Sequence, residues 1–307
     1  MTDISLPDRQ VLHLKSPGMK VAVIGPICND KNIVNKNIFE QIGGVTYYAG
    51  NALSFLGASV SIYGSSALAR NELEKSLVCE ELIRIHSQHT IKFINSYLMQ
   101  DPDVRTQRIN DFGHNIITFD DVKDVVVYDY IILGPLLHNN ISSRLIEQLA
   151  GAGPKIVLAA QGMIRYVMNN QIIWKHPENV LDVLSHIDFL FLNEVELNYI
   201  TNTETVFDGI NLLLKNGAKN VIVTYGRKGS TVCMKNKNYK IESFPAQRLV
   251  DVTGAGDSYM AGFIRALQLF DDPIKQGKFA AMTATMAIED DGCFHHELKD
   301  IYKRLSW

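Results

Sequence analysis

A glycine-rich run that ends in a carboxylate is the part of this 307-residue sequence best suited to chemistry. It begins at Asp251, continues through Gly254, Ala255 and Gly256, and ends at Asp257. Apolar residues recur at three- and four-residue spacing after it, which predicts a helix with Asp257 in its first turn. Backbone N–H groups at a helix N-terminus bind anions, and a carboxylate beside them can accept a proton. Phosphoryl transfer uses that combination of groups.

A tight turn before an N-capped helix is the alternative interpretation, and it explains most short Gly-x-Gly-Asp matches without any function. The longer match favours a function. Residues 251–257 and the small and aromatic residues after them resemble the C-terminal signature of the PfkB, or ribokinase-like, family of carbohydrate and nucleoside kinases. The resemblance implies that Asp257 is the catalytic base, with an anion hole formed by the N–H groups of Gly254, Ala255 and Gly256.

The bulk composition is that of a globular protein with a large core, since 46% of the residues are hydrophobic and 21% are charged. A net charge of −3 without a basic stretch disfavours a protein that coats nucleic acid. The four cysteines are scattered, which argues against a disulfide framework and favours a reducing cytoplasm. Residues 1–18 lack an apolar run long enough for a signal peptide or membrane span, so we expect a loose N-terminal extension.

Short apolar runs alternate with helical patterns along the chain, which predicts a parallel sheet covered on both faces. The fold class is therefore α/β, and the resemblance implies a three-layer α/β/α kinase domain over residues 19–307. The expected strands are 20–25, 60–63, 130–133, 155–158, 189–192 and 220–224, and the expected helices are 47–56, 141–149, 178–184, 205–216 and 280–288.

Two segments, near residues 26–42 and 90–119, alternate polar and apolar residues and predict antiparallel strands. A plain edge hairpin is the alternative. In the family resemblance these segments form a small β-sheet lid over the sugar site, and the lid is a candidate surface for a homodimer. A lid suits phosphoryl transfer because water must be excluded from the donor.

The acceptor is expected to bind near the N-terminal half of the chain. Gly43 and Gly44 open a predicted helix and resemble the family's N-terminal signature, where close backbone approach lets a polyol lie against the chain. Asp30 follows the first strand and matches the family's substrate-binding aspartate, although an isolated loop aspartate is usually only solvated. The chain departs from the family at Tyr48, where an asparagine is frequent.

Two further residues are candidates for the acceptor site. Gln161 and Arg165 form a Gln-Gly-x-x-Arg pattern that resembles PfkB members acting on inositol or related polyols, but Ala159 and Ala160 stand where an acidic residue is usual. Arg105 lies on the expected lid and could reach a substrate oxygen, with a solvated strand arginine as the alternative. The expected acceptor is thus a small polyol, sugar or nucleoside.

Other motifs concern the donor, ATP, and Mg²⁺. Thr224, Gly226 and Gly229 resemble the family's Thr-x-Gly-x-x-Gly turn at the nucleotide phosphates, with a hairpin turn as the alternative. Asn193 and Glu196 resemble the Asn-x-x-Glu motif that organises water-bound Mg²⁺, and acidic residues that favour the helix dipole are the alternative.

A monovalent cation such as K⁺ is also implied by the resemblance. Its candidate ligands are Asp251, Thr253, Ala287 and Gly292. His295 and His296 have no second ligand cluster in the sequence, so we expect a surface role for them.

These residues bear on three possible functions. An ATP-dependent kinase is the first, with Asp257 as base. A non-catalytic protein of the same fold that binds nucleotide or polyol is the second, motivated by Tyr48 and Ala159. A Rossmann dehydrogenase is excluded because no Gly-x-Gly-x-x-Gly follows the first strand.

Overall fold

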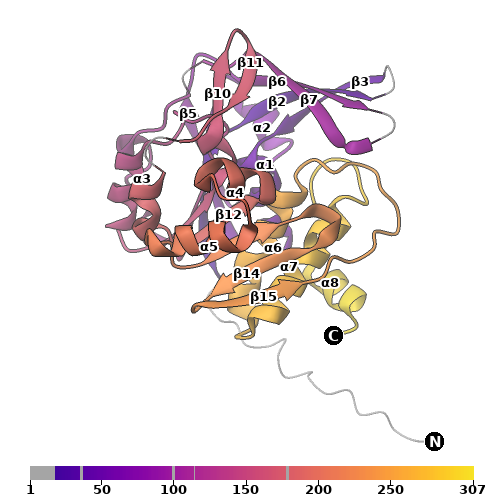
Figure 1. The fold of residues 1–307 in the computed structure, drawn as a ribbon. Helices are drawn as coiled ribbons and strands as arrows, with labels where there is room; N and C mark the ends of the chain where they lie inside the picture. The colour runs from indigo at the N-terminus through magenta and orange to yellow at the C-terminus, as the bar shows by residue number, and fades with distance from the viewer. Residues whose placement is uncertain (1–17, 35–36, 99–100, 114, 178–179) are drawn as a thin grey trace, which may run out of the picture.

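Two sheets organise the protein in the computed structural model, which describes residues 18–34, 37–98, 101–113, 115–177 and 180–307. The expected extension over residues 1–18 lies outside the described residues except for Gly18. The larger sheet has nine strands in the order β15-β14-β13-β12-β9-β8-β1-β4-β5, and the smaller has six in the order β10-β11-β7-β6-β2-β3 (Figure 1).

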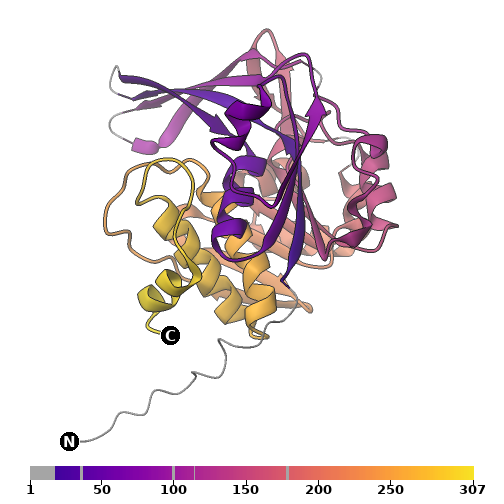
Figure 2. The same ribbon diagram turned by 180° about the vertical axis from the view of Figure 1, so that it is seen from behind.

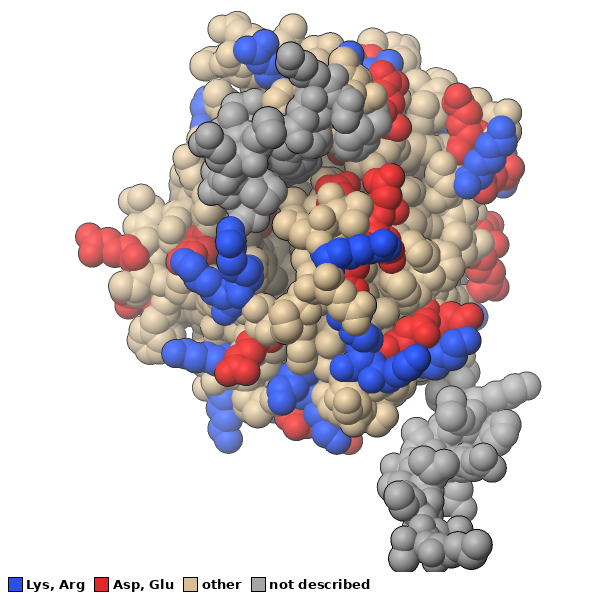
Figure 3. Space-filling model, turned by 90° about the vertical axis from the view of Figure 1, so that its right-hand side faces the viewer, with Lys and Arg blue, Asp and Glu red and all other residues tan. Residues whose placement is uncertain are grey.

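The central strand β1 (Lys20–Pro26) shows why helices cover both faces of the larger sheet. Side chains alternate along a strand, so Val21 and Val23 join one hydrophobic cluster while Ala22 and Ile24 join another. Helices α1, α6 and α7 bury apolar residues in the first cluster, and α3, α4 and α5 do so in the second. Figures 1 and 2 show the resulting three layers, which confirm the predicted fold class. On the face shown in Figure 3, Lys and Arg side chains lie among Asp and Glu side chains, so neither sign of charge covers it alone.

The strands of the larger sheet run parallel from β5 to β13, and β14 and β15 are added antiparallel. Parallel strands carry their carboxyl ends to one edge, where loops gather functional groups. The strands are β4 (Ser59–Ser66), β5 (Glu81–His86), β8 (Tyr130–Leu133), β9 (Lys155–Ala159), β12 (Phe189–Asn193), β13 (Val221–Thr224), β14 (Ser230–Met234) and β15 (Lys237–Ile241).

Most predicted helices are present. The exception is 178–184, where the structure has a 3₁₀ helix, η5 (Leu181–His186), and residues 178–179 lie outside the described part. The α-helices are α1 (Val45–Phe55), α2 (Arg70–Glu74), α3 (Ser143–Ala150), α4 (Glu194–Thr201), α5 (Val206–Lys215), α6 (Ala255–Leu269), α7 (Pro273–Ala287) and α8 (Leu298–Leu305). The other 3₁₀ helices are η2 (Phe119–Asp121), η3 (Val125–Val127), η4 (Ala160–Ile164) and η6 (Gly226–Lys228). Among the described residues, no helix combines the length and the apolar character needed to cross a membrane.

The smaller sheet contains both segments expected to form the lid. The prediction of antiparallel strands is correct within each segment, but β2 and β6 pair parallel where the two segments meet. The strands of the second segment end at Asp111 and not near residue 119. The hairpin of β10 and β11, which sequence periodicity did not indicate, extends the sheet through β7. The strands are β2 (Cys28–Val34), β3 (Asn37–Gly43), β6 (Ile91–Leu98), β7 (Asp101–Asp111), β10 (Arg165–Met168) and β11 (Gln171–Trp174).

Candidate active site

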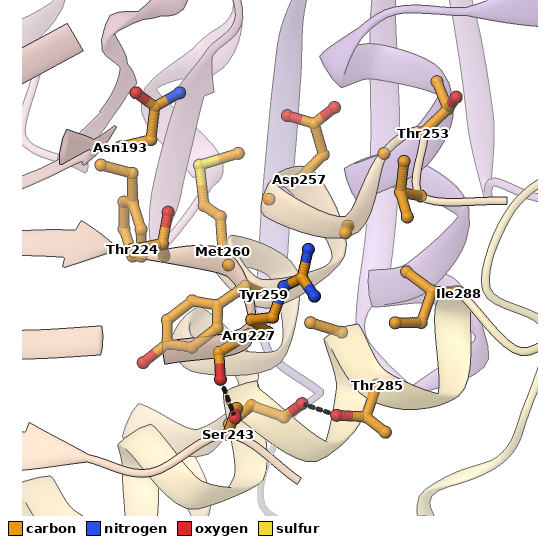
Figure 4. A pocket seen from close by; sticks show the side chains of 18 of the residues that line it. Asn193, Thr224, Arg227, Ser243, Thr253, Asp257, Tyr259, Met260, Thr285 and Ile288 are labelled. Carbon is orange, nitrogen blue, oxygen red and sulfur yellow. Dashed lines mark hydrogen bonds between the residues drawn. The ribbon is translucent and has the colours of Figure 1, made fainter. Parts of the chain in front are cut away.

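A cavity of about 1040 Å³ opens where β12 and β13 end and where α6 begins. Figure 4 shows Asn193, Asp257 and Thr253 around one part of it, and Thr285 and Ile288 around another. Its lining combines a polar end with an apolar slot. The residues that line it include Gln161, Arg165, Asn193, Glu196, Thr224, Gly226, Arg227, Gly229, Phe244, Pro245, Leu249, Thr253, Gly254, Ala255, Gly256, Asp257, Ala284 and Ile288.

The N-terminus of α6 forms the polar end. Gly254 precedes the helix with a left-handed backbone, φ +76°, and Asp257 is the third helical residue, as predicted. A Cβ at Gly254 would overlap the ring of Tyr48. Glycine is therefore required both by the backbone conformation and by the packing of the ring against it.

The turn before α6 is held by its own hydrogen bonds. Asp251 Oδ1 accepts from Thr253 N at 2.9 Å and from Thr253 Oγ1 at 2.7 Å. Ala255 N donates a long bond of 3.3 Å to Val252 O. An anion at the helix N-terminus would therefore draw this N–H away from Val252.

Asn193 and Glu196 bind each other at the start of α4. Asn193 Oδ1 accepts from Glu196 N, and a Glu196 carboxylate oxygen accepts from Asn193 N, both at 2.9 Å. This is a capping box, so the helix-start alternative is part of what the residues do. Both side chains nevertheless line the cavity, because β12 ends at Asn193.

The turn after β13 borders the same cavity. Thr224 ends the strand, Gly226 begins η6, and the hairpin with β14 that was the alternative interpretation is present. Ser243 Oγ donates to Arg227 O at 2.6 Å, which anchors the turn. Arg227 lines the cavity, and Figure 4 shows its guanidinium reaching inward. The turn thus presents backbone and a cation to the polar end.

The acceptor candidates Asp30, Gly43 and Gly44 lie together but are not among the residues that line this cavity. Asp30 lies in β2, and not in the expected loop, with 6% of its surface exposed. A Cβ at Gly43 would lie 2.8 Å from Asp30 Oδ2, so glycine is what allows the carboxylate to pack there. The close backbone approach expected at Gly43 is thus made to Asp30.

Tyr48 lies between the acceptor candidates and the start of α6. Its hydroxyl accepts a hydrogen bond from Gln41 Nε2 at 3.1 Å, while its ring packs on Gly254. Burial raises the pKa of Tyr48 well above its ordinary value, and the negative charges of Asp30 and Asp251 raise it further. The phenol is therefore neutral and occupies the space between the two groups of residues.

Gln161 and Arg165 line the cavity from η4 and the start of β10. Arg165 is a buried cation, with 6% of its surface exposed. Burial and the Asp30 charge raise the pKa of Cys28, whereas the Arg165 charge lowers it. The charge of Arg165 therefore extends to the Asp30 group, and this side chain connects the cavity to the acceptor candidates.

Among the described residues, three further predicted residues, Asp251, Ala287 and Gly292, do not line the cavity. The backbone of Arg105 belongs to β7, but its side chain lies outside the described part of the chain. Ala287 ends α7, and Gly292 lies beside Tyr47, neither of them in the lining.

The sequence did not identify the apolar slot or Arg227. The slot includes Phe244, Leu249, Ala284 and Ile288, which come from a loop and from the end of α7. Only the small-residue pattern of 280–288 pointed there. Arg227 stands inside the glycine-containing turn, so a charged residue within that motif was the available signal.

The fold and the site together define a class: a three-layer α/β protein with a helix N-terminus and an adjacent aspartate at its main cavity. The chain matches the pfkB family of carbohydrate kinases over residues 66–299, about three quarters of its length, and it belongs to that family.

Individual relatives agree with the family. A nucleoside kinase from Methanocaldococcus jannaschii is 38% identical over 116 residues, which cover 38% of this chain and 37% of the relative. A ribokinase from Arabidopsis thaliana is 28% identical over 183 residues, which cover 58% and 45% of the two chains. The matched segments thus span less than half of these curated relatives.

Solved structures share the fold over nearly the whole chain. A pyrophosphate-dependent kinase of the ribokinase family, complexed with a pyrophosphate analog and myo-inositol, has a TM-score of 0.79 at 20% identity and covers 92% of this chain and 99% of its own. Arabidopsis thaliana ribokinase, complexed with ribose and ATP, has a TM-score of 0.74 at 21% identity, with coverage of 94% and 99%.

Proposed function

We propose that this protein transfers the terminal phosphoryl group of ATP to a hydroxyl of a small polyol, sugar or nucleoside. The observation that carries the proposal is the position of Asp257. It lies in the first turn of α6, three residues after Gly254, and it lines the main cavity. A helix N-terminus supplies anion-binding N–H groups, and the carboxylate beside them supplies a base.

In the proposed reaction, Asp257 accepts the proton of the acceptor hydroxyl as that oxygen attacks the phosphorus. The N–H groups of Gly254, Ala255 and Gly256 stabilise the charge that develops on the transferred phosphoryl oxygens. The contact lowers the barrier to the extent that it is stronger in the transition state than in the bound donor.

The apolar slot supports a nucleotide as the donor. Phe244, Leu249 and Ile288 offer a surface that suits an aromatic base, and inorganic pyrophosphate would leave this surface in contact with water. Thr224, Gly226 and Gly229 also line the cavity, and Figure 4 shows Thr224 across from Ile288 with Asp257 nearby, so the donor phosphates would extend toward Asp257. We therefore expect ATP to be a better donor than pyrophosphate.

The residues at the expected cation sites suit the two ions. The Asn193 amide and the Glu196 carboxylate are hard oxygen donors on the cavity wall, and they would hold Mg²⁺ through water. Asp251 Oδ2 is buried without a hydrogen-bond partner among the described residues, which suits a K⁺ ion held with carbonyl groups of Thr253, Ala287 and Gly292. Bound Mg²⁺ would neutralise charge on the donor phosphates.

The acceptor would lie between Asp30 and Asp257. The Asp30 carboxylate can accept hydroxyl hydrogen bonds, and Gln161 and Arg165 approach from the cavity side. We predict that Arg105, from the smaller sheet, contacts an oxygen of the acceptor. This sheet would act as the lid. A homodimer through this sheet is also a prediction, since β3 forms its open edge.

The test of the proposal is Asp257→Asn. We expect kcat to fall by about 10²–10⁴-fold, the range typical of general base catalysis, while ATP affinity changes little. The assay measures ADP release from ATP with a panel of polyols, sugars and nucleosides, and orthophosphate release when pyrophosphate replaces ATP as the donor. Asp271→Asn is the matched control, because Asp271 follows the far end of the same helix and is exposed.

Near-normal turnover in Asp257→Asn would remove the assigned base. The second candidate function is a non-catalytic nucleotide or polyol sensor, favoured by Tyr48 between Asp30 and Gly254. If the wild-type chain binds ATP but releases no ADP with any acceptor, the sensor replaces the kinase.

A further inference from the structure

A second group of ionisable side chains lies outside the main cavity, in the loop between α7 and α8. Asp290, His295 and His296 each offer one ligand atom, and these three atoms lie within 4.8 Å of one another. Sequence spacing alone indicated no third ligand for the two histidines. Folding of the loop supplies Asp290, which is five residues away in the chain.

The Nε2 atoms of both histidines face one carboxylate oxygen of Asp290. His296 Nε2 lies 2.8 Å and His295 Nε2 lies 3.6 Å from the same oxygen, Asp290 Oδ2. The two imidazole rings are stacked, with centroids 4.9 Å apart and planes at 20°. Both imidazole rings therefore turn their Nε2 edges toward the carboxylate of Asp290.

The hydrogen bond of His295 sets its tautomer. His295 Nδ1 lies 3.1 Å from the carbonyl oxygen of Cys293, so Nδ1 carries the proton that it donates. In the neutral ring Nε2 then carries a lone pair, and it faces a carboxylate oxygen that is also an acceptor. A positive centre between two facing acceptors, either a proton or a metal ion, would stabilise this arrangement.

The carboxylate and the second ring are held in place by neighbours. Arg248 binds Asp290 through Oδ1, which leaves Oδ2 toward the imidazoles. Phe294, with 1% of its surface exposed, packs edge-on against His296 at a centroid distance of 5.5 Å. Outer contacts of this kind orient the ligands of protein metal sites.

We propose that Asp290, His295 and His296 form a binding site for a borderline divalent ion such as Zn²⁺, with water as the fourth ligand. Two imidazole nitrogens and one carboxylate oxygen match the donors that zinc prefers, whereas Mg²⁺ prefers oxygen alone. The site differs from the cation sites of the proposed reaction, whose donors are oxygens.

The bound ion would stabilise one wall of the main cavity. Arg248 Nε donates to Glu289 O at 2.6 Å, and Val250 N donates to Ile288 O at 2.9 Å, so the segment before Asp251 is tied to the end of α7. Leu249 and Ile288, which lie at this junction, line the cavity. Bound zinc would link Asp290 to His295 and His296, and so would brace the loop to which Arg248 is hydrogen-bonded.

The experiment is a titration of the full chain, without a histidine tag and after chelator treatment, with ZnCl₂ by isothermal calorimetry. We expect one ion per chain and, for His295→Ala or His296→Ala, affinity lower by about tenfold or more. His89→Ala is the matched control, because His89 pairs with Asp111 at 3.0 Å as a single histidine–aspartate pair. This variant should bind zinc as the wild type does.

The proposal is overturned if the wild-type chain binds no zinc, or if both cluster variants bind it unchanged. Loss of binding in His89→Ala equal to that in the cluster variants would also overturn it. If a variant fails to fold, X-ray absorption of the zinc-loaded wild type decides the matter, since it must show imidazole nitrogens at about 2.0–2.1 Å.

Discussion

Substitution of Gly254 by alanine tests whether the start of α6 is as tightly constrained as the structure indicates. The left-handed backbone at φ +76° costs about 1–2 kcal/mol for a residue with a Cβ. The added methyl group would also overlap the Tyr48 ring, and overpacking of this kind costs typically about 1–3 kcal/mol. We therefore expect Gly254→Ala to lower the free energy of unfolding by about 2–5 kcal/mol.

The same substitution should impair phosphoryl transfer, because relief of the overlap displaces the N–H groups beside Asp257. A displacement near 1 Å costs about 10²-fold in rate. Urea unfolding and steady-state kinetics measure the two effects. In a Tyr48→Ala background the overlap is gone, so the cost of Gly254→Ala should fall to the backbone cost of about 1–2 kcal/mol.

Gly256→Ala is the control for stability. A Cβ at Gly256 meets nothing within 4 Å, and the residue is helical, so alanine should stabilise the protein by about 0.5–1 kcal/mol. If Gly254→Ala and Gly256→Ala had equal effects on unfolding, or if the Tyr48→Ala background left the cost unchanged, the reasoning would be wrong.

Three further outcomes follow from the site and its supports. Arg227→Met should lower kcat/KM for the donor by about tenfold, through loss of a charged contact to phosphate, whereas Lys228→Met, one residue on and outside the lining, should not. Arg304→Met should lower the free energy of unfolding by about 1.5–3 kcal/mol, because Arg304 donates two hydrogen bonds, at 2.8 and 2.9 Å, to the buried Glu289 carboxylate. Those bonds lower the pKa of Glu289, so their contribution is present above the ordinary glutamate pKa and is lost as the pH falls through the lowered value. Urea titrations between pH 7 and about pH 3 should therefore show a smaller decline in Arg304→Met than in the wild type.

Sequence patterns predicted those strands and helices that are specified by residues close together in the chain. The apolar run at β1 and the glycine run before α6 identified a buried strand and a helix start, since burial and backbone freedom depend on adjacent residues. The helix expected at 178–184 was wrong because apolar spacing does not distinguish an α-helix from the 3₁₀ helix η5. The parallel pairing of β2 with β6 depends on residues far apart in the chain, which no local pattern records.

The sequence by itself determined that a carboxylate follows a glycine-rich turn at a helix start, because Gly254 and Asp257 are three residues apart and one helix start positions both. Only the tertiary structure decided what surrounds them. Tyr48 packs on Gly254 across about two hundred residues of sequence, and Arg165 joins the cavity to the Asp30 group. Asp290 likewise meets His295 and His296 only through the path of their loop. Such contacts are set by packing of separate elements, whereas the chemistry of the turn is set by the order of neighbouring residues.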